Sequence, residues 1–185
     1  MLSSALTAHA AKPRANTQRT WQLQGGVRYG LELTSHDYKL WQVGWGGAVG
    51  RTLKNSIYIG GSLDAYQGEQ FHYIPADKRS PFVGGNYWQG QAQVGYDIGL
   101  SEHWLWRPKV GAGAARLNVN NCQTLVGNQA DCRRTISYNG SLVPGVELIF
   151  ARDVLVSLEA RYALLFDTIT IKHAVMGVAN LGFQF

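Results

Sequence analysis

Charged side chains recur at alternate positions of strand-like segments, a spacing suited to ion pairing inside a protein. Residues two apart in a β-strand share one face. The basic residues are Arg28, Arg107, Lys109, Arg161 and Lys172, and the acidic residues are Glu32, Asp64, Asp97, Glu147 and Glu159. The two sets are equal in number, so the charges could neutralise one another in a shared interior. We predict a structural charge network here, with no catalytic role.

Two cysteines bracket a polar segment, "NNCQTLVGNQADCRR", at Cys122 and Cys132. In an oxidising compartment such a pair predicts a disulfide, and two free thiols are the alternative. A metal site would need further ligands, and no nearby His or Cys completes one. The five histidines are scattered along the chain, so we expect neither a metal nor a cofactor.

A two-residue alternation defines the segments that carry these residues. In "WQLQGGVRYGLEL", residues 21–33, every odd position is apolar or glycine, which is typical of a strand with two different faces. The pattern recurs in 40–50, 57–68, 87–100, 104–117, 136–150, 154–166 and 174–185. Tight turns are predicted at 52–56, 101–103 and 151–153, and the other connections at 34–38, 69–86, 118–135 and 167–168. Short turns alternating with longer loops predict an all-β fold, an eight-stranded antiparallel up-and-down barrel.

The apolar face of these strands is predicted to meet lipid. Most segments run 11 to 15 residues, enough for a tilted strand to cross a bilayer. Charges on the apolar face occur only at segment ends, at Lys39, Arg51 and Arg116. The aromatic residues form two predicted girdles: Trp21, Trp104, Trp106, Phe150, Phe183 and Phe185 at the short-turn end, and Trp41, Trp45, Trp88, Tyr138 and Phe166 at the other. A soluble, lipocalin-like barrel with an apolar interior is the alternative.

The composition argues against a nucleic-acid-binding protein and against a protein that crosses the membrane with a helix. The net charge is +5, but the basic residues form no compact run, so nucleic acid is not an expected partner. No apolar run reaches the length of a transmembrane helix.

Residues 1–19 contain an Ala8-His9-Ala10 pattern that resembles a signal cleavage site, and we interpret them as a disordered leader or signal remnant before a barrel at 20–185. Pro108 and Pro144 fall inside predicted strands, where we expect a bulge or a strand start.

These features resemble the small eight-stranded outer-membrane proteins, the group of the OmpA barrel domain, OmpX and the opacity-type adhesins. The resemblance covers residues 20–185 and includes the ending "NLGFQF". Leu181, Phe183 and Phe185 match the signal that such proteins present to the barrel-assembly machinery. The resemblance implies the outer membrane of a Gram-negative bacterium and contact with its lipid and lipopolysaccharide.

Three classes of function remain open for such a barrel. The expected one is non-enzymatic: a filled polar lumen, with envelope integrity, adhesion or anchoring of a partner complex as the role. A lipid A-modifying enzyme is one alternative, but the His-x-Ser pair of the deacylase type fails, since "KHAV" places Val175 at the serine position. A narrow ion-permeable pore is the other, although long side chains tend to fill so narrow a barrel.

The two long loops carry the predicted recognition surface. Loops 69–86 and 118–135 contain Lys78, Arg79, Arg133 and Arg134, and Lys39 lies in a neighbouring connection. These cations could bind lipopolysaccharide phosphates or an envelope protein partner. Solvated loop charge is the alternative.

Overall fold

The structure is a computed structural model that describes residues 21–33, 41–67, 82–124, 130–152, 154–166 and 171–185; for 82–85, 119–124 and 130–135 it describes the backbone alone. The strands are β1 (Trp21–Glu32), β2 (Val43–Thr52), β3 (Ile57–Gln67), β4 (Phe82–Tyr96), β5 (Ile98–Gly99), β6 (Trp104–Thr124), β7 (Ala130–Ala151), β8 (Leu155–Phe166) and β9 (Ile171–Gln184). No helix in these ranges is long and apolar enough to span a bilayer. The predicted leader, residues 1–19, lies outside them.

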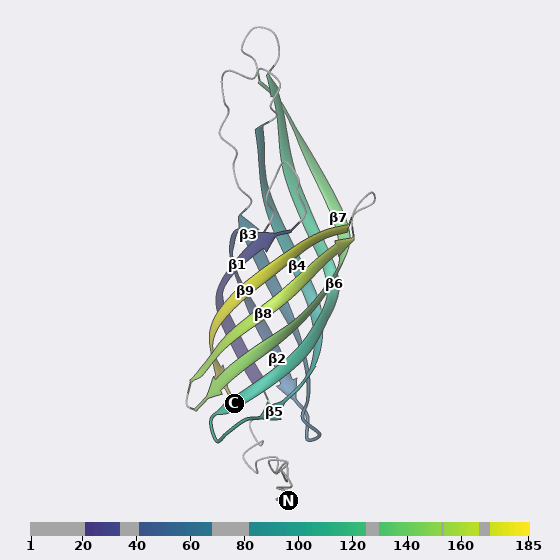
Figure 1. Cartoon of the computed structure of the whole chain (residues 1–185). Coiled ribbons are helices and arrows are strands. Elements are labelled where there is room, and N and C mark those ends of the chain that lie inside the picture. The colour runs from purple at the N-terminus through teal and green to yellow at the C-terminus, as the bar shows by residue number, and fades with distance from the viewer. Residues whose placement is uncertain (1–20, 34–40, 68–81, 125–129, 153, 167–170) are drawn as a thin grey trace, which may run out of the picture.

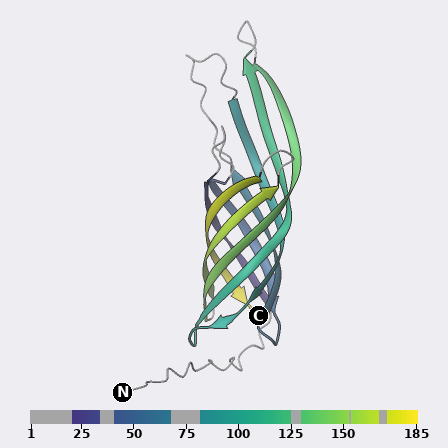
Figure 2. The ribbon, with the colours of Figure 1, turned by 45° about the vertical axis from the view of Figure 1, so that its right-hand side comes forward.

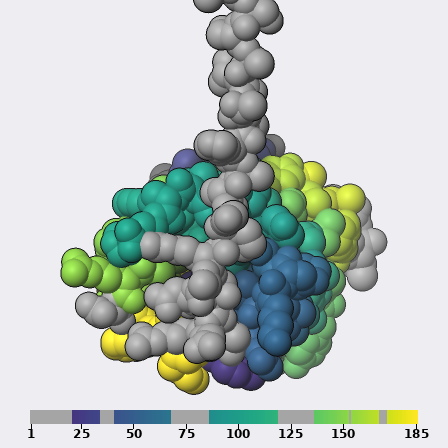
Figure 3. Space-filling view, turned by 90° about the horizontal axis from the view of Figure 1, so that it is seen from below, coloured from purple at the N-terminus to yellow at the C-terminus, as the bar shows by residue number. Residues whose placement is uncertain are grey.

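The strands close into one antiparallel barrel (Figure 1). Consecutive strands pair along the chain, except that β4 and β5 both pair with β6. β1 pairs with β9, so the first and last strands complete the ring. Seen from the turn end, segments from early, middle and late in the chain surround the axis (Figure 3). The predicted eight-stranded barrel is confirmed, with β4 and β5 together forming one of its eight walls.

The two prolines lie inside strands without shifting the register. The β4–β6 ladder stops at Gly95↔Lys109 and resumes in β5 at Ile98↔Trp106, at the same register. Pro108 lies opposite this break and has no N–H to donate. The β7–β8 ladder likewise omits Pro144 while keeping its register. The expected bulge or strand start is therefore wrong: each proline interrupts the ladder locally.

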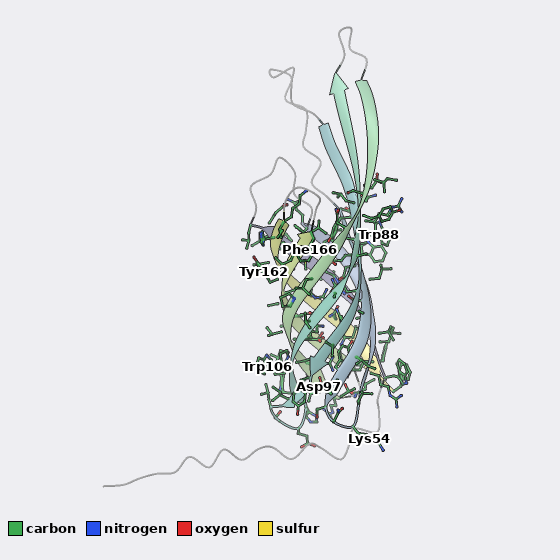
Figure 4. The ribbon with its side chains drawn as sticks, turned by 90° about the vertical axis from the view of Figure 1, so that its right-hand side faces the viewer. Lys54, Trp88, Asp97, Trp106, Tyr162 and Phe166 are labelled. Atoms are coloured by element: carbon green, nitrogen blue, oxygen red, sulfur yellow. The ribbon has the colours of Figure 1, made fainter. Side chains whose placement is uncertain are left out.

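The alternation separates an outer apolar face from an inner face, as the sequence predicts. Along β8 the side chains alternate between buried and exposed with few exceptions. Both girdles have exposed aromatic rings, for example Phe183 and Phe185 at one end and Trp45 and Tyr138 at the other. Figure 4 shows Trp88 and Phe166 near the loop end and Trp106 near the turn end.

One girdle residue and one loop differ from the sequence-based prediction. Trp41 precedes β2 in a bend and is only 1% exposed, so it lies inside the barrel and not in the outer girdle. Most of the predicted loop 118–135 is strand, because β6 and β7 pair continuously up to Thr124↔Ala130. The predicted loop 69–86 is also shorter, since β4 begins at Phe82.

Candidate functional site

An ion pair crosses the lumen at its middle. The Arg161 guanidinium on β8 donates to Asp64 Oδ2 on β3 at 2.8 Å. Asp64 also accepts a hydrogen bond from Arg28 Nε on β1 at 2.7 Å, and Arg28 Nη1 donates to Asn180 Oδ1 at 2.7 Å. The Arg28 and Asp64 side chains are fully buried. One carboxylate thus holds two arginines from different walls.

The chain of ion pairs continues toward the turn end. Arg161 Nε lies 2.6 Å from Glu159 Oε1, and Glu159 Oε2 lies 3.0 Å from Lys109 Nζ. The same ammonium lies 3.0 Å from Glu147 Oε2. Each carboxylate here has a cation on either side.

The turn end of the chain is formed around Arg107. Its Nη1 lies 3.4 Å from Glu147 Oε2, its Nη2 donates to Asp97 Oδ2 at 3.0 Å, and its guanidinium lies 3.8 Å from the Tyr58 ring centroid. Asp97 accepts a further hydrogen bond from Thr52 at 2.8 Å. Asp97 lies in the break between β4 and β5, and the register that continues across this break aligns it with Arg107.

Eight side chains therefore alternate in charge along one connected path. In order they are Arg28, Asp64, Arg161, Glu159, Lys109, Glu147, Arg107 and Asp97. The four positive and four negative charges cancel. We call this path the ion chain. Because every member has an oppositely charged neighbour, none of these eight ions is isolated in the low-dielectric interior.

Two further charged residues that the alternation places inside are not among the eight members of the ion chain. Lys172 on β9 is buried, and Glu32 at the end of β1 is half-buried. Both make interactions of their own in the structure.

The loop end of the lumen is mostly apolar, which the sequence analysis missed. It is filled by Trp41, Tyr66, Tyr87, Ala115, Leu117, Val143, Ala163, Leu165, Ala174 and Met176, all buried. We call this group the aromatic cap. The Trp41 and Tyr87 rings pack edge to face at 5.5 Å, Tyr66 lies 5.6 Å from Tyr87, and the Tyr66 hydroxyl lies 3.2 Å from Met176 Sδ. The expected polar interior is therefore mostly apolar at this level, although Lys172, the register partner of Leu165, and Asn139, the partner of Ala115, are also buried there.

Glycines on the inner face make room for these side chains. At Gly46 a methyl group would fall on the Asp64 carboxylate and 2.5 Å from the Leu63 carbonyl oxygen. Only glycine lets β2 approach the ion chain this closely.

The backbone places the two cysteines opposite each other. Cys122 on β6 and Cys132 on β7 are register partners in the antiparallel ladder. Partners of this kind lie about 4.5–5.5 Å apart at Cα, within the range that a disulfide requires. The disulfide stays a prediction, now with a matching register.

The other predicted site residues divide into two groups. Leu181, Phe183 and Phe185 face outward at the turn end with about 60% exposure, and their role in assembly stays a prediction. Of the loop cations, Lys39, Lys78 and Arg79 lie outside the described residues. Arg133 and Arg134 stand in β7, opposite Asn121 and Asn120.

A closed barrel with an apolar outer face and an ion-paired lumen defines the class of transmembrane β-barrels. A model of the outer membrane protein β-barrel domain matches residues 1–184. The chain belongs to that family and is an integral protein of the outer membrane. A comparison with curated protein sequences gives no match.

Several solved barrels share the fold at low identity. Ail, the attachment invasion locus protein of Yersinia pestis, is 14% identical with a TM-score of 0.58, over 90% of this chain and 99% of that one. Neisserial surface protein A is 12% identical with a TM-score of 0.57, over 89% and 97%. The N-terminal barrel of Pseudomonas aeruginosa OprF is 17% identical with a TM-score of 0.53, over 90% and 98%. At these identities the likeness concerns the fold.

Proposed function

We propose that this outer-membrane barrel is a non-enzymatic recognition protein. Its loop end serves adhesion or the anchoring of a partner complex, and its filled barrel contributes to envelope integrity. The observation that carries the proposal is the extension of β6 and β7, which are 21 and 22 residues long. Bilayer crossing needs only about half that length.

The extension stands beyond the rest of the barrel. The β7–β8 pairing ends at Gly140↔Phe166, whereas β7 continues to pair with β6 as far as Ala130. Figures 1 and 2 show β4, β6 and β7 rising above the other strands at the loop end. Such a sheet holds residues clear of the membrane surface, where a partner can reach them.

An anionic polysaccharide is the partner class that the charge favours. The chain carries a net charge of +5, and Arg133 and Arg134 lie within the extension. A barrel of the same fold, Ail, has been solved with the heparin analogue sucrose octasulfate; it is 15% identical with a TM-score of 0.53, over 89% of this chain and 97% of that one. Guanidinium groups bind sulfate and phosphate through paired hydrogen bonds.

Binding of heparin by the refolded protein in phospholipid nanodiscs tests the proposal. We expect binding that weakens as salt rises, because the attraction between exposed charges is screened. The double variant Arg133→Gln/Arg134→Gln should bind less, while Lys54→Gln, in a turn at the other end, should bind as the parent does. Equal binding by all three proteins, or no binding, would contradict the proposal.

The enzyme alternative has a separate test. Incubation of the nanodisc protein with lipopolysaccharide should leave the mass of its lipid A unchanged if the role is recognition. A new lipid A species that forms only with the folded protein would contradict the non-enzymatic assignment.

A further inference from the structure

A row of outward-facing residues crosses the wall formed by β2, β3, β4, β6 and β7 near the loop end. The register aligns Trp45 with Ala65, Ala65 with Trp88, Trp88 with Arg116, and Arg116 with Tyr138. Register partners point to the same side of a sheet, with Cβ atoms about 5 Å apart. Arg116 therefore lies between two aromatic side chains on the outer wall.

Four of the five members of this row are exposed on the outer wall. Tyr138 is 72% exposed, Trp45 59% and Trp88 39%, and Arg116 is also exposed. The Trp45 and Trp88 rings meet edge to face at 5.8 Å, with Ala65 buried between them in register. In Figure 4 Trp88 lies at the level of Phe166, in the girdle nearest the loops. This is the level of the lipid headgroups of the outer leaflet.

Arg116 brings a positive charge to this level of the outer wall, where its side chain is exposed. Among the described residues, no carboxylate forms an ion pair with it. The outward-facing Arg51 at the turn end differs, because its guanidinium lies 5.8 Å from the Trp21 ring. An exposed guanidinium at a membrane surface is complementary to an anionic headgroup.

Small residues occupy the outer wall directly below the row. Gly90, Ala114 and Gly140 are register partners one outward step nearer the turn end, and Ala92 and Ala112 follow below them. A methyl group at Gly90 would meet only Leu63 Cδ1 at 3.9 Å, and one at Gly140 only Phe166 Cδ2 at 3.7 Å. We call these five residues the small-residue patch. Acyl chains can approach the backbone more closely there than over the larger residues on either side.

We propose that Trp88, Arg116 and Tyr138 bind the phosphorylated sugar headgroup of an outer-leaflet glycolipid, whose acyl chains lie over the small-residue patch. The guanidinium donates two hydrogen bonds to the phosphate. The two aromatic side chains present amphipathic rings at headgroup level, beside the sugar. This lateral site lies on the barrel wall and goes beyond the recognition role of the loop end.

Titration of the detergent-solubilised protein with purified lipid A, read by native mass spectrometry, tests the site. The parent protein should retain lipid A more tightly than dephosphorylated lipid A or phosphatidylglycerol. Arg116→Gln should weaken lipid A binding about tenfold, the effect of one charge-assisted contact. Arg51→Gln removes the outward arginine at the opposite end and should leave the affinity unchanged.

A second variant tests the acyl contact without removing charge. Gly90→Leu adds a side chain in open space, so the barrel should still fold and should still shift in mobility on boiling in SDS. It should weaken retention of lipid A while leaving the binding of heparin at the loops intact.

Each contrary result is distinct. Equal retention by Arg116→Gln and the parent would overturn the proposed headgroup site, and equal loss in Arg51→Gln would show a general charge effect. Equal binding of phosphatidylglycerol would overturn the sugar preference and assign the phosphate to ordinary phospholipid. None of these results bears on heparin binding through Arg133 and Arg134, so the two proposals can fail separately.

Discussion

Arg161 and Asp64 join opposite walls of the barrel, although 97 residues separate them in the sequence. β8 and β3 lie four strands apart in either direction around the eight-walled ring. Their contact at 2.8 Å therefore spans the lumen rather than neighbouring strands. It is the second link of the ion chain, and it connects two opposite walls of the barrel through side chains instead of backbone hydrogen bonds.

Removal of the Arg161 cation should destabilise the barrel. Arg161→Met leaves Asp64 and Glu159 buried with one cation fewer between them, and breaking a buried pair in this way costs about 3 kcal/mol or more. Urea titration of the protein in lipid vesicles, followed by tryptophan fluorescence, measures the change. Lys54→Met, in an exposed turn, is the control and should change the free energy of unfolding by less than about 0.5 kcal/mol.

A double variant separates charge balance from lost packing. Asp64→Asn together with Arg161→Met restores neutrality to the ion chain, so it should be more stable than Arg161→Met alone. If the double variant lost at least as much free energy of unfolding as the two single variants lose in sum, the charges would not act as a balanced set.

The inner glycines should tolerate no side chain, whereas an outer glycine should. Gly46→Ala places a methyl group on the Asp64 carboxylate and should cost about 1–3 kcal/mol of stability. Gly177→Ala, at an outward position on β9 with nothing within 4 Å of the added carbon, is the matched control. Equal unfolding curves for the two variants would contradict the close packing of β2 on the ion chain.

The register of β6 and β7 predicts a disulfide between Cys122 and Cys132. Alkylation of the folded protein should label neither cysteine before reduction and both afterwards. A peptide digest without reduction should contain the linked pair. Labelling of both thiols in protein prepared from an oxidising compartment would favour the free-thiol alternative.

The sequence predicts best the strand segments inside the membrane, where the outer face must be apolar against lipid and the inner face lines the lumen. Inside the membrane the outer face must be apolar, so β1 shows a clean two-residue alternation, and the direction of each of its side chains follows from it. The members of the ion chain follow from the same parity, because a lipid-facing charge at mid-bilayer costs about 2–4 kcal/mol. Which cation meets which carboxylate depends on distances across the lumen, and no local pattern contains these.

The parts that the sequence did not predict lie beyond the membrane or outside the strands, where no lipid-facing side has to be apolar. Beyond the membrane both faces of β6 and β7 can be polar, so residues 118–124 and 130–135 read as a loop. Trp41 matches the parity of Trp45, but it precedes β2 in a bend, where strand parity no longer decides direction. The aromatic cap could have been recognised in the sequence. Inner positions such as Leu165 and Met176 are apolar, so both faces of the strand are apolar at this level.

The ion chain and the aromatic cap together predict a barrel that does not conduct. In the cap, Trp41 and Tyr87 are each 1% exposed. Their replacement in Trp41→Ala/Tyr87→Ala removes two large rings from the loop end of the lumen. We expect small conductance steps from this variant, and none from the control Tyr138→Ala, whose ring lies on the outer wall.

The most direct test of the filled lumen is single-channel recording of the parent protein in planar lipid bilayers. The structure predicts a silent bilayer under conditions in which insertion is verified by the heat-dependent mobility shift in SDS. Regular conductance steps from the parent protein would contradict the filled lumen and would show that the barrel forms a pore.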